Sequence, residues 1–82
     1  MKHAGPAALD ALEPLLIEMR KCESLRERKR GAFYRGGQGW LHFHEDPAGL
    51  FADLKIDGEW MRFAVNAPSE CAALLRRLEK AL

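Results

Sequence analysis

Apolar and polar side chains alternate along several stretches in the second half of the chain. Between residues 40 and 45, the sequence Trp-Leu-His-Phe-His-Glu puts both imidazoles on one side and the leucine and phenylalanine on the other. A period of two is that of a β-strand whose two faces have different surroundings. The alternation and the intervening turn residues predict strands at residues 31–35, 39–44, 50–56 and 59–65. The polar segment 24–29 is expected to add a short edge strand, whose charges discourage edge-to-edge pairing.

Two further segments carry the helical period. Apolar side chains at positions 9, 12, 16 and 19 step by three or four residues and predict a helix over residues 8–23. Pro14 lacks an N–H and fits best in a first helical turn, so the regular part of this helix starts between Asp10 and Glu13. Pro68 opens a second helix in the same way. The apolar stripe of that helix consists of Cys71, Leu74, Leu75, Leu78 and Leu82.

The order of these elements, α-β-β-β-β-α, defines the expected fold class. Two amphipathic helices and a sheet with one clean apolar face predict an α+β two-layer sandwich, with an antiparallel meander sheet and both helices on one face. We expect residues 1–82 to form a single domain, because a chain of this length buries only about 60% of its unfolded surface. The predicted core consists of Leu41, Phe43, Leu54, Phe63, Leu74, Leu75 and Leu78.

The turn residues predict how the strands pair. Asp57-Gly58 lies between two alternating strands and favours a two-residue type I′ turn, which places Asp53 opposite Arg62. Opposite charges directly across a strand pair contribute roughly 0.2–1 kcal/mol, so this match supports the register. The short connection before the preceding strand then places His42 beside Asp53.

The sheet face opposite the apolar one is the main functional candidate. It mixes aromatic rings with charges and is too apolar for an ordinary solvated face, yet too charged for a core. Phe33 and Arg35 are expected to join this face from the first strand of the sheet. The candidate ligand or interface residues are Trp40, His42, His44, Phe51, Asp53, Lys55, Trp60 and Arg62.

Several chemistries are compatible with this mixed face. His42 beside Asp53 is either a general base with an orienting carboxylate or a surface histidine in a cross-strand hydrogen bond; we favour the second, because that row holds no Ser, Cys or Thr. His42 and His44 lack a third strong ligand, so we expect no metal site and no cofactor. The aromatic and basic side chains form either a stacking platform for single-stranded nucleic acid or a surface that a partner covers.

The distribution of charge adds a second candidate site. The net charge is +1, but residues 20–35 hold seven basic side chains against two glutamates, and residues 45–59 hold five acids against one lysine. These segments are either two solvated surfaces or a basic rim that binds anions, beside an acidic patch that favours self-association. The candidate anion-binding residues are Arg26, Arg28, Lys29, Arg30 and Arg35.

Composition narrows the class of protein. With 48% hydrophobic and 30% charged residues, the chain has the balance of a globular domain. No apolar run approaches the roughly 20 residues of a membrane span, and the first residues lack the apolar centre of a signal peptide, so we expect a cytoplasmic protein. The two cysteines fall at apolar positions of the expected helices, which favours reduced thiols.

Several segments together resemble a known family. They are Gly31-Ala32-Phe33-Tyr34, Leu41-His42-Phe43-His44-Glu45, Ala52-Asp53-Leu54 and the closing leucine-rich helix. This arrangement is similar to a family of small bacterial proteins of unknown function labelled "luciferase-like domain", a label that is no evidence of light emission. The resemblance implies the same α+β layout and brings no catalytic residues with it. More loosely, the helix-sheet-helix order resembles small bacterial DNA-binding proteins of the double-wing type.

These observations lead to one main hypothesis about function. We expect a non-enzymatic binding or interaction domain that uses the mixed sheet face, either to form a homodimer or contact a protein partner, or to bind a small anionic or aromatic ligand. The alternatives are a weak nucleic-acid-binding module that uses the segment Arg26 to Arg35, and an enzyme that uses His42 and Asp53. The near-neutral net charge argues against nucleic acid, and no membrane partner is expected.

Overall fold

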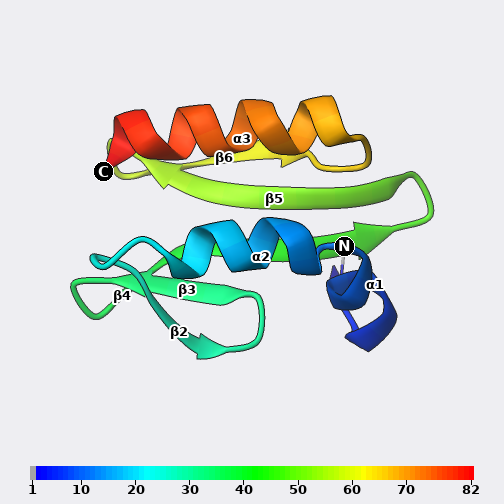
Figure 1. Ribbon diagram of the computed structural model, residues 1–82, viewed down its shortest axis with the longest axis horizontal. Coiled ribbons are helices and arrows are strands. Elements are labelled where there is room, and N and C mark those ends of the chain that lie inside the picture. Colours follow the sequence, from blue (N-terminus) through cyan, green and yellow to red (C-terminus); the bar gives the residue numbers. More distant parts are fainter. Residues whose placement is uncertain (1) are drawn as a thin grey trace.

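A computed structural model describes residues 2–82 of the chain. These residues form three helices and six strands, with the strands in one open antiparallel sheet (Figure 1). The elements are β1 (Lys2–His3), α1 (Pro6–Ala11), α2 (Glu13–Arg20), β2 (Arg26–Lys29), β3 (Ala32–Arg35), β4 (Gln38–Asp46), β5 (Gly49–Ile56), β6 (Glu59–Ala64) and α3 (Pro68–Ala81). The strand order is β2-β3-β4-β5-β6, and β1 pairs with β4 off this path.

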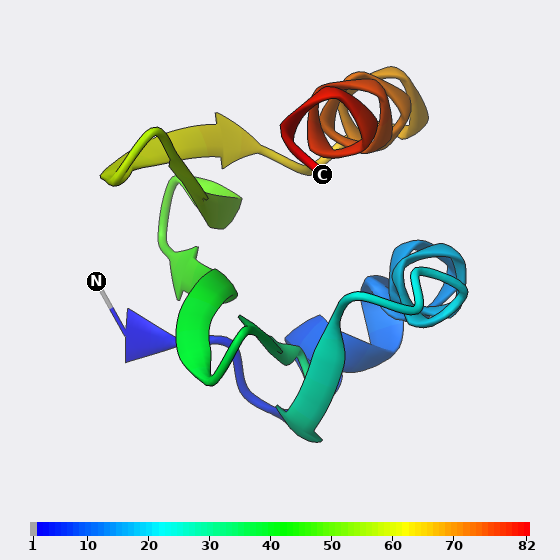
Figure 2. The ribbon, with the colours of Figure 1, turned by 90° about the vertical axis from the view of Figure 1, so that its left-hand side faces the viewer.

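The sheet and the long helices form two layers. Figure 2 shows α2 and α3 on the same side of a strongly curved sheet. We call the face that these helices cover the inner face, and the opposite one the outer face. The predicted α+β sandwich with both helices on one side is confirmed, and so is the charged edge strand, which is β2.

The N-terminal part of the chain differs from the prediction. The single helix expected over residues 8–23 is two helices, α1 and α2, with Leu12 between them. Pro14 has no N–H to donate to the carbonyl of Asp10, so the α-helical series of hydrogen bonds is interrupted at this point. The strand β1 was not predicted, because two residues are too short to show a period.

The predicted pairing of the last three strands is confirmed. Asp57 and Gly58 have φ values of 51° and 82°, and a type I′ turn requires this sign at both positions. Asp53 therefore lies opposite Arg62, and on its other side opposite His42. The turn residues and the period of two were enough to fix this register.

A β-bulge in β4 overturns part of the predicted outer face. Phe33 pairs with Leu41, yet Tyr34 pairs with Gly39, so Trp40 is an extra residue in β4. One extra residue shifts the alternation of side chains by one position. Trp40 consequently joins Leu41 on the inner face, where it is only 6% exposed, and the prediction that it lies on the outer face is wrong.

The same shift reverses the assignment of β3. Phe33 was expected on the outer face but is buried in the core, and Tyr34 takes the outer position. Arg35 was also expected on the outer face. Its Nη1 instead donates a hydrogen bond of 3.0 Å to the carbonyl oxygen of Ala81, at the end of α3 on the inner side.

The hydrophobic core lies between the inner face and the helices. Five of the predicted core residues are buried, while Phe63 and Leu75 are half-buried at its margin. The buried core residues are Leu9, Leu12, Leu15, Leu16, Met19, Phe33, Trp40, Leu41, Phe43, Ala52, Leu54, Val65, Leu74 and Leu78. Because this core fills only one side of the sheet, the outer face remains open for recognition.

Candidate functional site

The centre of the outer face is an ion pair between β5 and β6. The guanidinium of Arg62 donates two hydrogen bonds of 2.8 Å, from Nε and Nη2, to the two carboxylate oxygens of Asp53. These hydrogen bonds hold the pKa of Asp53 below its usual range. The charge of this carboxylate is therefore largely matched before any ligand arrives.

The two histidines of β4 contact partners other than those their strand positions suggest. His42 is paired with Asp53 in the backbone register, but its ring packs against Trp60, with 5.0 Å between ring centroids. The carboxylate of Asp53 instead approaches Nδ1 of His44, at 3.2 Å. The right-handed twist of a sheet rotates neighbouring strands and produces such diagonal contacts.

His44 is held close to Asp53 without being hydrogen-bonded to it. Its Nδ1 is buried, and in the described part of the chain it has no partner in hydrogen-bonding geometry. No hydrogen bond joins His42 to Asp53 within residues 2–82 either. The pair required by the enzymatic hypothesis is therefore not formed.

A third histidine, missed by the sequence analysis, completes a cluster. β1 runs antiparallel to β4 and places His3 opposite His44, with their ring centroids 4.8 Å apart. The His3 ring also lies 6.1 Å from that of His42. All three histidines of the chain thus gather at one place on the outer face. No sequence signal pointed to His3, because its position depends entirely on the pairing of β1.

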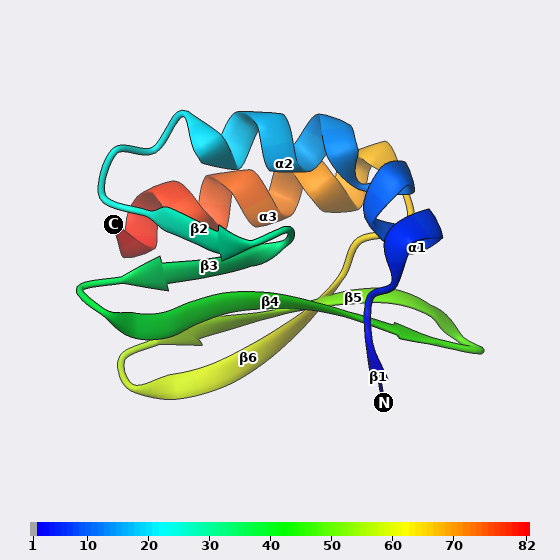
Figure 3. The ribbon, with the colours of Figure 1, turned by 90° about the horizontal axis from the view of Figure 1, so that it is seen from below.

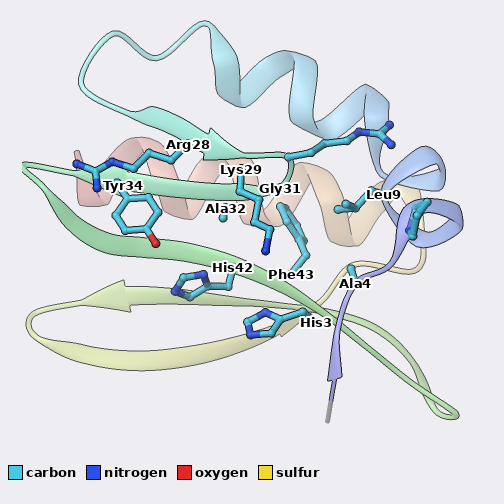
Figure 4. Close-up of a pocket in the computed structure, with 12 residues that line it drawn as sticks. His3, Ala4, Leu9, Arg28, Lys29, Gly31, Ala32, Tyr34, His42 and Phe43 are labelled. Atoms are coloured by element: carbon cyan, nitrogen blue, oxygen red, sulfur yellow. The ribbon is translucent and has the colours of Figure 1, made fainter.

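A pocket of about 520 Å³ lies beside this cluster. β4 pairs with β3 along its first half and with β1 along its second half (Figure 3). Residues of β1, β2, β3 and β4 line the pocket at this change of neighbour. We call it the outer pocket. Its lining residues are His3, Ala4, Pro6, Leu9, Arg28, Lys29, Arg30, Gly31, Ala32, Tyr34, His42 and Phe43. Figure 4 shows the Tyr34 hydroxyl and the Lys29 ammonium pointing toward the strip where His3 and His42 lie.

The bulge in β4 also shapes the surroundings of His42. It turns Gly39 to the outer face, where an added Cβ would lie 3.2 Å from Nε2 of His42. The absence of a side chain at Gly39 leaves space for the imidazole. The ring of Tyr34 meets that of His42 edge to face, with 6.5 Å between centroids. His42 is therefore fixed between Tyr34 on one side and Trp60 on the other.

The outer pocket is electropositive. Three basic side chains line it and no Asp or Glu does, among the residues that the structure describes. Arg30 is partly neutralised by ion pairs of 2.8 Å to Asp10 and 2.9 Å to Glu13. Arg28 and Lys29 make no ion pair within residues 2–82, and the Arg28 guanidinium lies 4.8 Å from the centroid of the Tyr34 ring. These two cations are available to an anion.

The remaining members of the predicted basic site lie elsewhere. Arg26 lines a second hollow beside the Gly36-Gly37 turn, which Arg28 and Tyr34 also line, and Arg35 lies on the inner side against α3. The segment predicted as one anion-binding rim is therefore divided between three places. Arg28, Lys29 and Arg30 line the outer pocket with His42, while Arg26 meets Arg28 in the second hollow.

The surroundings of His42 and His44 favour the neutral forms of these two side chains. Burial lowers the pKa of His42 below its usual range, and the neighbouring imidazoles of His3 and His44 act in the same direction, whereas Asp53 opposes them. Burial is also the main cause of the lowered pKa of His44, again against the effect of Asp53. His42 and His44 therefore resist protonation while no further negative charge is nearby.

The other candidate residues lie further along the outer face. The ammonium of Lys55 lies 5.7 Å from the centroid of the Trp60 ring, and Phe51 is half-buried opposite Ala64. Trp60 is 47% exposed. Neither Trp60 nor Lys55 lines the outer pocket, so the predicted site splits into a pocket and a flat aromatic extension.

Other features of the described residues bear on metals, thiols and membranes. Within residues 2–82, no group of three or more His, Cys, Asp or Glu side chains is arranged to hold a metal ion. Cys22 and Cys71 are free, half-buried thiols. None of the three helices has the length and apolar character that crossing a membrane would require.

Comparison with known proteins gives no relative on which to base a function. No family model matches the chain, and no curated protein or solved structure is significantly similar to it. The resemblance to the luciferase-like family therefore stays a prediction. The site has to be interpreted from its own chemistry.

Proposed function

We propose that this domain is a non-enzymatic binding protein that holds a small organic anion with an aromatic or planar body in the outer pocket. The observation that carries the proposal is a pocket that combines Arg28 and Lys29 with aromatic walls and excludes carboxylates. Its volume of about 520 Å³ falls within the range of small-molecule sites. Ring faces suit a planar ligand, and unpaired cations suit its negative group.

The alternatives receive less support from the same surface. In the part of the chain that the structure describes, no Ser or Cys lines the outer pocket to act as a nucleophile, and no carboxylate is hydrogen-bonded to His42. A polynucleotide would need a continuous basic track, whereas Arg26 and Arg35 lie apart from the pocket. These points favour a small ligand over both catalysis and nucleic-acid binding.

The exposed apolar residues of β6 also argue against self-association as the main function. Trp60 and Met61 are the large exposed apolar side chains of β6, but they are adjacent in the strand and so point to opposite faces. They do not form one patch, and known stable interfaces need a contiguous one. The free thiols agree with the expected cytoplasmic location, which we keep as part of the proposal.

Three probes separate the contributions of charge and ring. They are 2-naphthalenesulfonate, which has both, methanesulfonate, which has only the charge, and 2-naphthalenemethanol, which has only the ring. We expect measurable binding of 2-naphthalenesulfonate by isothermal titration calorimetry, with much weaker binding of the other two. Amide chemical-shift changes should concentrate on β1, β2 and β3 around the outer pocket.

A pair of double variants tests where the anion binds. Arg28→Gln with Lys29→Gln should weaken 2-naphthalenesulfonate by about tenfold, since losing two contacts at a solvent-open site costs roughly 1–2 kcal/mol. The matched control, Arg76→Gln with Lys80→Gln, removes the same charge from exposed positions of α3 on the other side of the sheet. Equal weakening in both variants, or no binding by the wild type, would overturn the proposal.

A further inference from the structure

His42 occupies a position where the charge of a bound anion would act directly on it. It lines the outer pocket together with Arg28 and Lys29, and its ring lies 6.1 Å from that of His3 in the histidine cluster. The titratable groups that contact His42 or act on its charge are His3 from β1, Tyr34 from β3, His44 from β4 and Asp53 from β5, and Arg28 and Lys29 of β2 line the same pocket. Most of these groups are cationic or can become so.

Among residues 2–82, no carboxylate lies free beside His42 to balance a proton on it. Asp53 is the nearest acid in the register, but Arg62 takes both of its oxygens, and its remaining approach is to His44. The half-buried position of His42 and the two neighbouring imidazoles then keep its pKa low. A negative group in the outer pocket would supply the countercharge that Asp53, already paired with Arg62, does not supply to His42.

We propose that the outer pocket takes up its anion together with a proton, which His42 carries, so that binding tightens as the pH falls. This inference rests on the proposed function, because it concerns the regulation of the same site. The positive charges of Arg28 and Lys29 set the basal affinity, and His42 sets its pH dependence.

The sign of the effect follows from linkage. The anion favours the protonated imidazole, so the bound form holds a proton at pH values where the free form has lost it. Affinity is highest in acid, falls by up to about tenfold per pH unit while one proton is taken up on binding, and levels off once His42 is neutral in both forms. The domain would thus release its ligand as the pH rises.

The test uses 2-naphthalenesulfonate, because its charge does not change between about pH 5 and 8, the range in which histidine titrates. Calorimetry in buffers of different ionisation enthalpy gives the number of protons taken up. For the wild type we expect uptake of a fraction of one proton, with affinity falling as the pH is raised. His42→Gln should bind with an affinity that varies much less with pH and should take up fewer protons than the wild type, whereas His44→Gln, which lies outside the pocket lining, should keep the pH dependence.

A measurement on the wild-type protein tests the same inference without depending on whether a variant folds. An NMR titration of the His42 ring proton should give a higher pKa with 2-naphthalenesulfonate bound than without it. An affinity that is constant with pH, or an unchanged His42 titration, would overturn this inference while leaving the proposed function intact. Absence of binding at every pH would instead overturn the proposed function.

Discussion

The two tryptophans provide the sharpest test of the structure. A strictly alternating β4 would place Trp40 and Trp60 on the same outer row, flanking Lys55. The β-bulge instead buries Trp40 in the core at 6% exposure and leaves Trp60 at 47%. Substituting each by alanine should therefore give very different losses of stability.

The magnitudes follow from burial. A large-to-small change at a buried tryptophan typically costs about 3–5 kcal/mol, so Trp40→Ala should remove a large part of the roughly 5–15 kcal/mol that stabilises a small domain. Trp60→Ala loses a half-exposed ring and its contacts with His42 and Lys55, and should cost about 1 kcal/mol or less. The milder Trp40→Phe should cost roughly 1–2 kcal/mol and keeps the test available if Trp40→Ala does not fold.

Denaturant titration followed by circular dichroism measures these losses, and fluorescence checks the placement independently. Each alanine variant retains a single tryptophan. Trp60→Ala should emit at the short wavelength of a buried indole, and a folded Trp40 variant should emit closer to tryptophan in water. Equal losses of stability, or a solvent-like spectrum from Trp60→Ala, would refute the bulge and return Trp40 to the outer face.

Two further predictions concern the stability of the pocket and of the cluster. Gly31→Ala should destabilise the domain by about 1–2 kcal/mol from the backbone alone, because φ is +81° and the new Cβ would also lie 2.6 Å from Cδ2 of Leu9; an unchanged denaturation midpoint would contradict this conformation. Because the pKa values of His42 and His44 are lowered in the folded protein, the unfolded chain binds more protons than the folded one. The contribution of these two histidines to the free energy of unfolding is therefore present above the ordinary histidine pKa of 6.5 and is lost as the pH falls through the lowered values. Denaturant titrations between about pH 5 and 8 should therefore show stability falling toward acid, and falling less in a His42→Gln, His44→Gln double variant; the same slope in both proteins would show that other groups are responsible.

Part of the site could be derived from local sequence alone. The period of two sorted His42, His44 and Asp53 onto one face, and the Asp57-Gly58 turn gave the pairing with Arg62 that the structure has. These features are local, because a turn conformation and a strand period depend on a few neighbouring residues. A signal of the bulge was also present: two large apolar residues, Trp40 and Leu41, are adjacent in an otherwise alternating strand.

The sequence by itself determined the strand period, the type of the Asp57-Gly58 turn, the pairing register of β4, β5 and β6 and the α+β class, since each follows from backbone preferences and apolar spacing over short stretches. Only the tertiary structure decided which residues form the pocket. β1 brings His3 to the cluster from the far end of the chain, and the change of neighbour along β4, from β3 to β1, opens the space beside His42. Such contacts depend on which strands meet and on how the sheet twists. The hydrophobic period of a single segment specifies neither the choice of neighbouring strand nor the twist of the sheet.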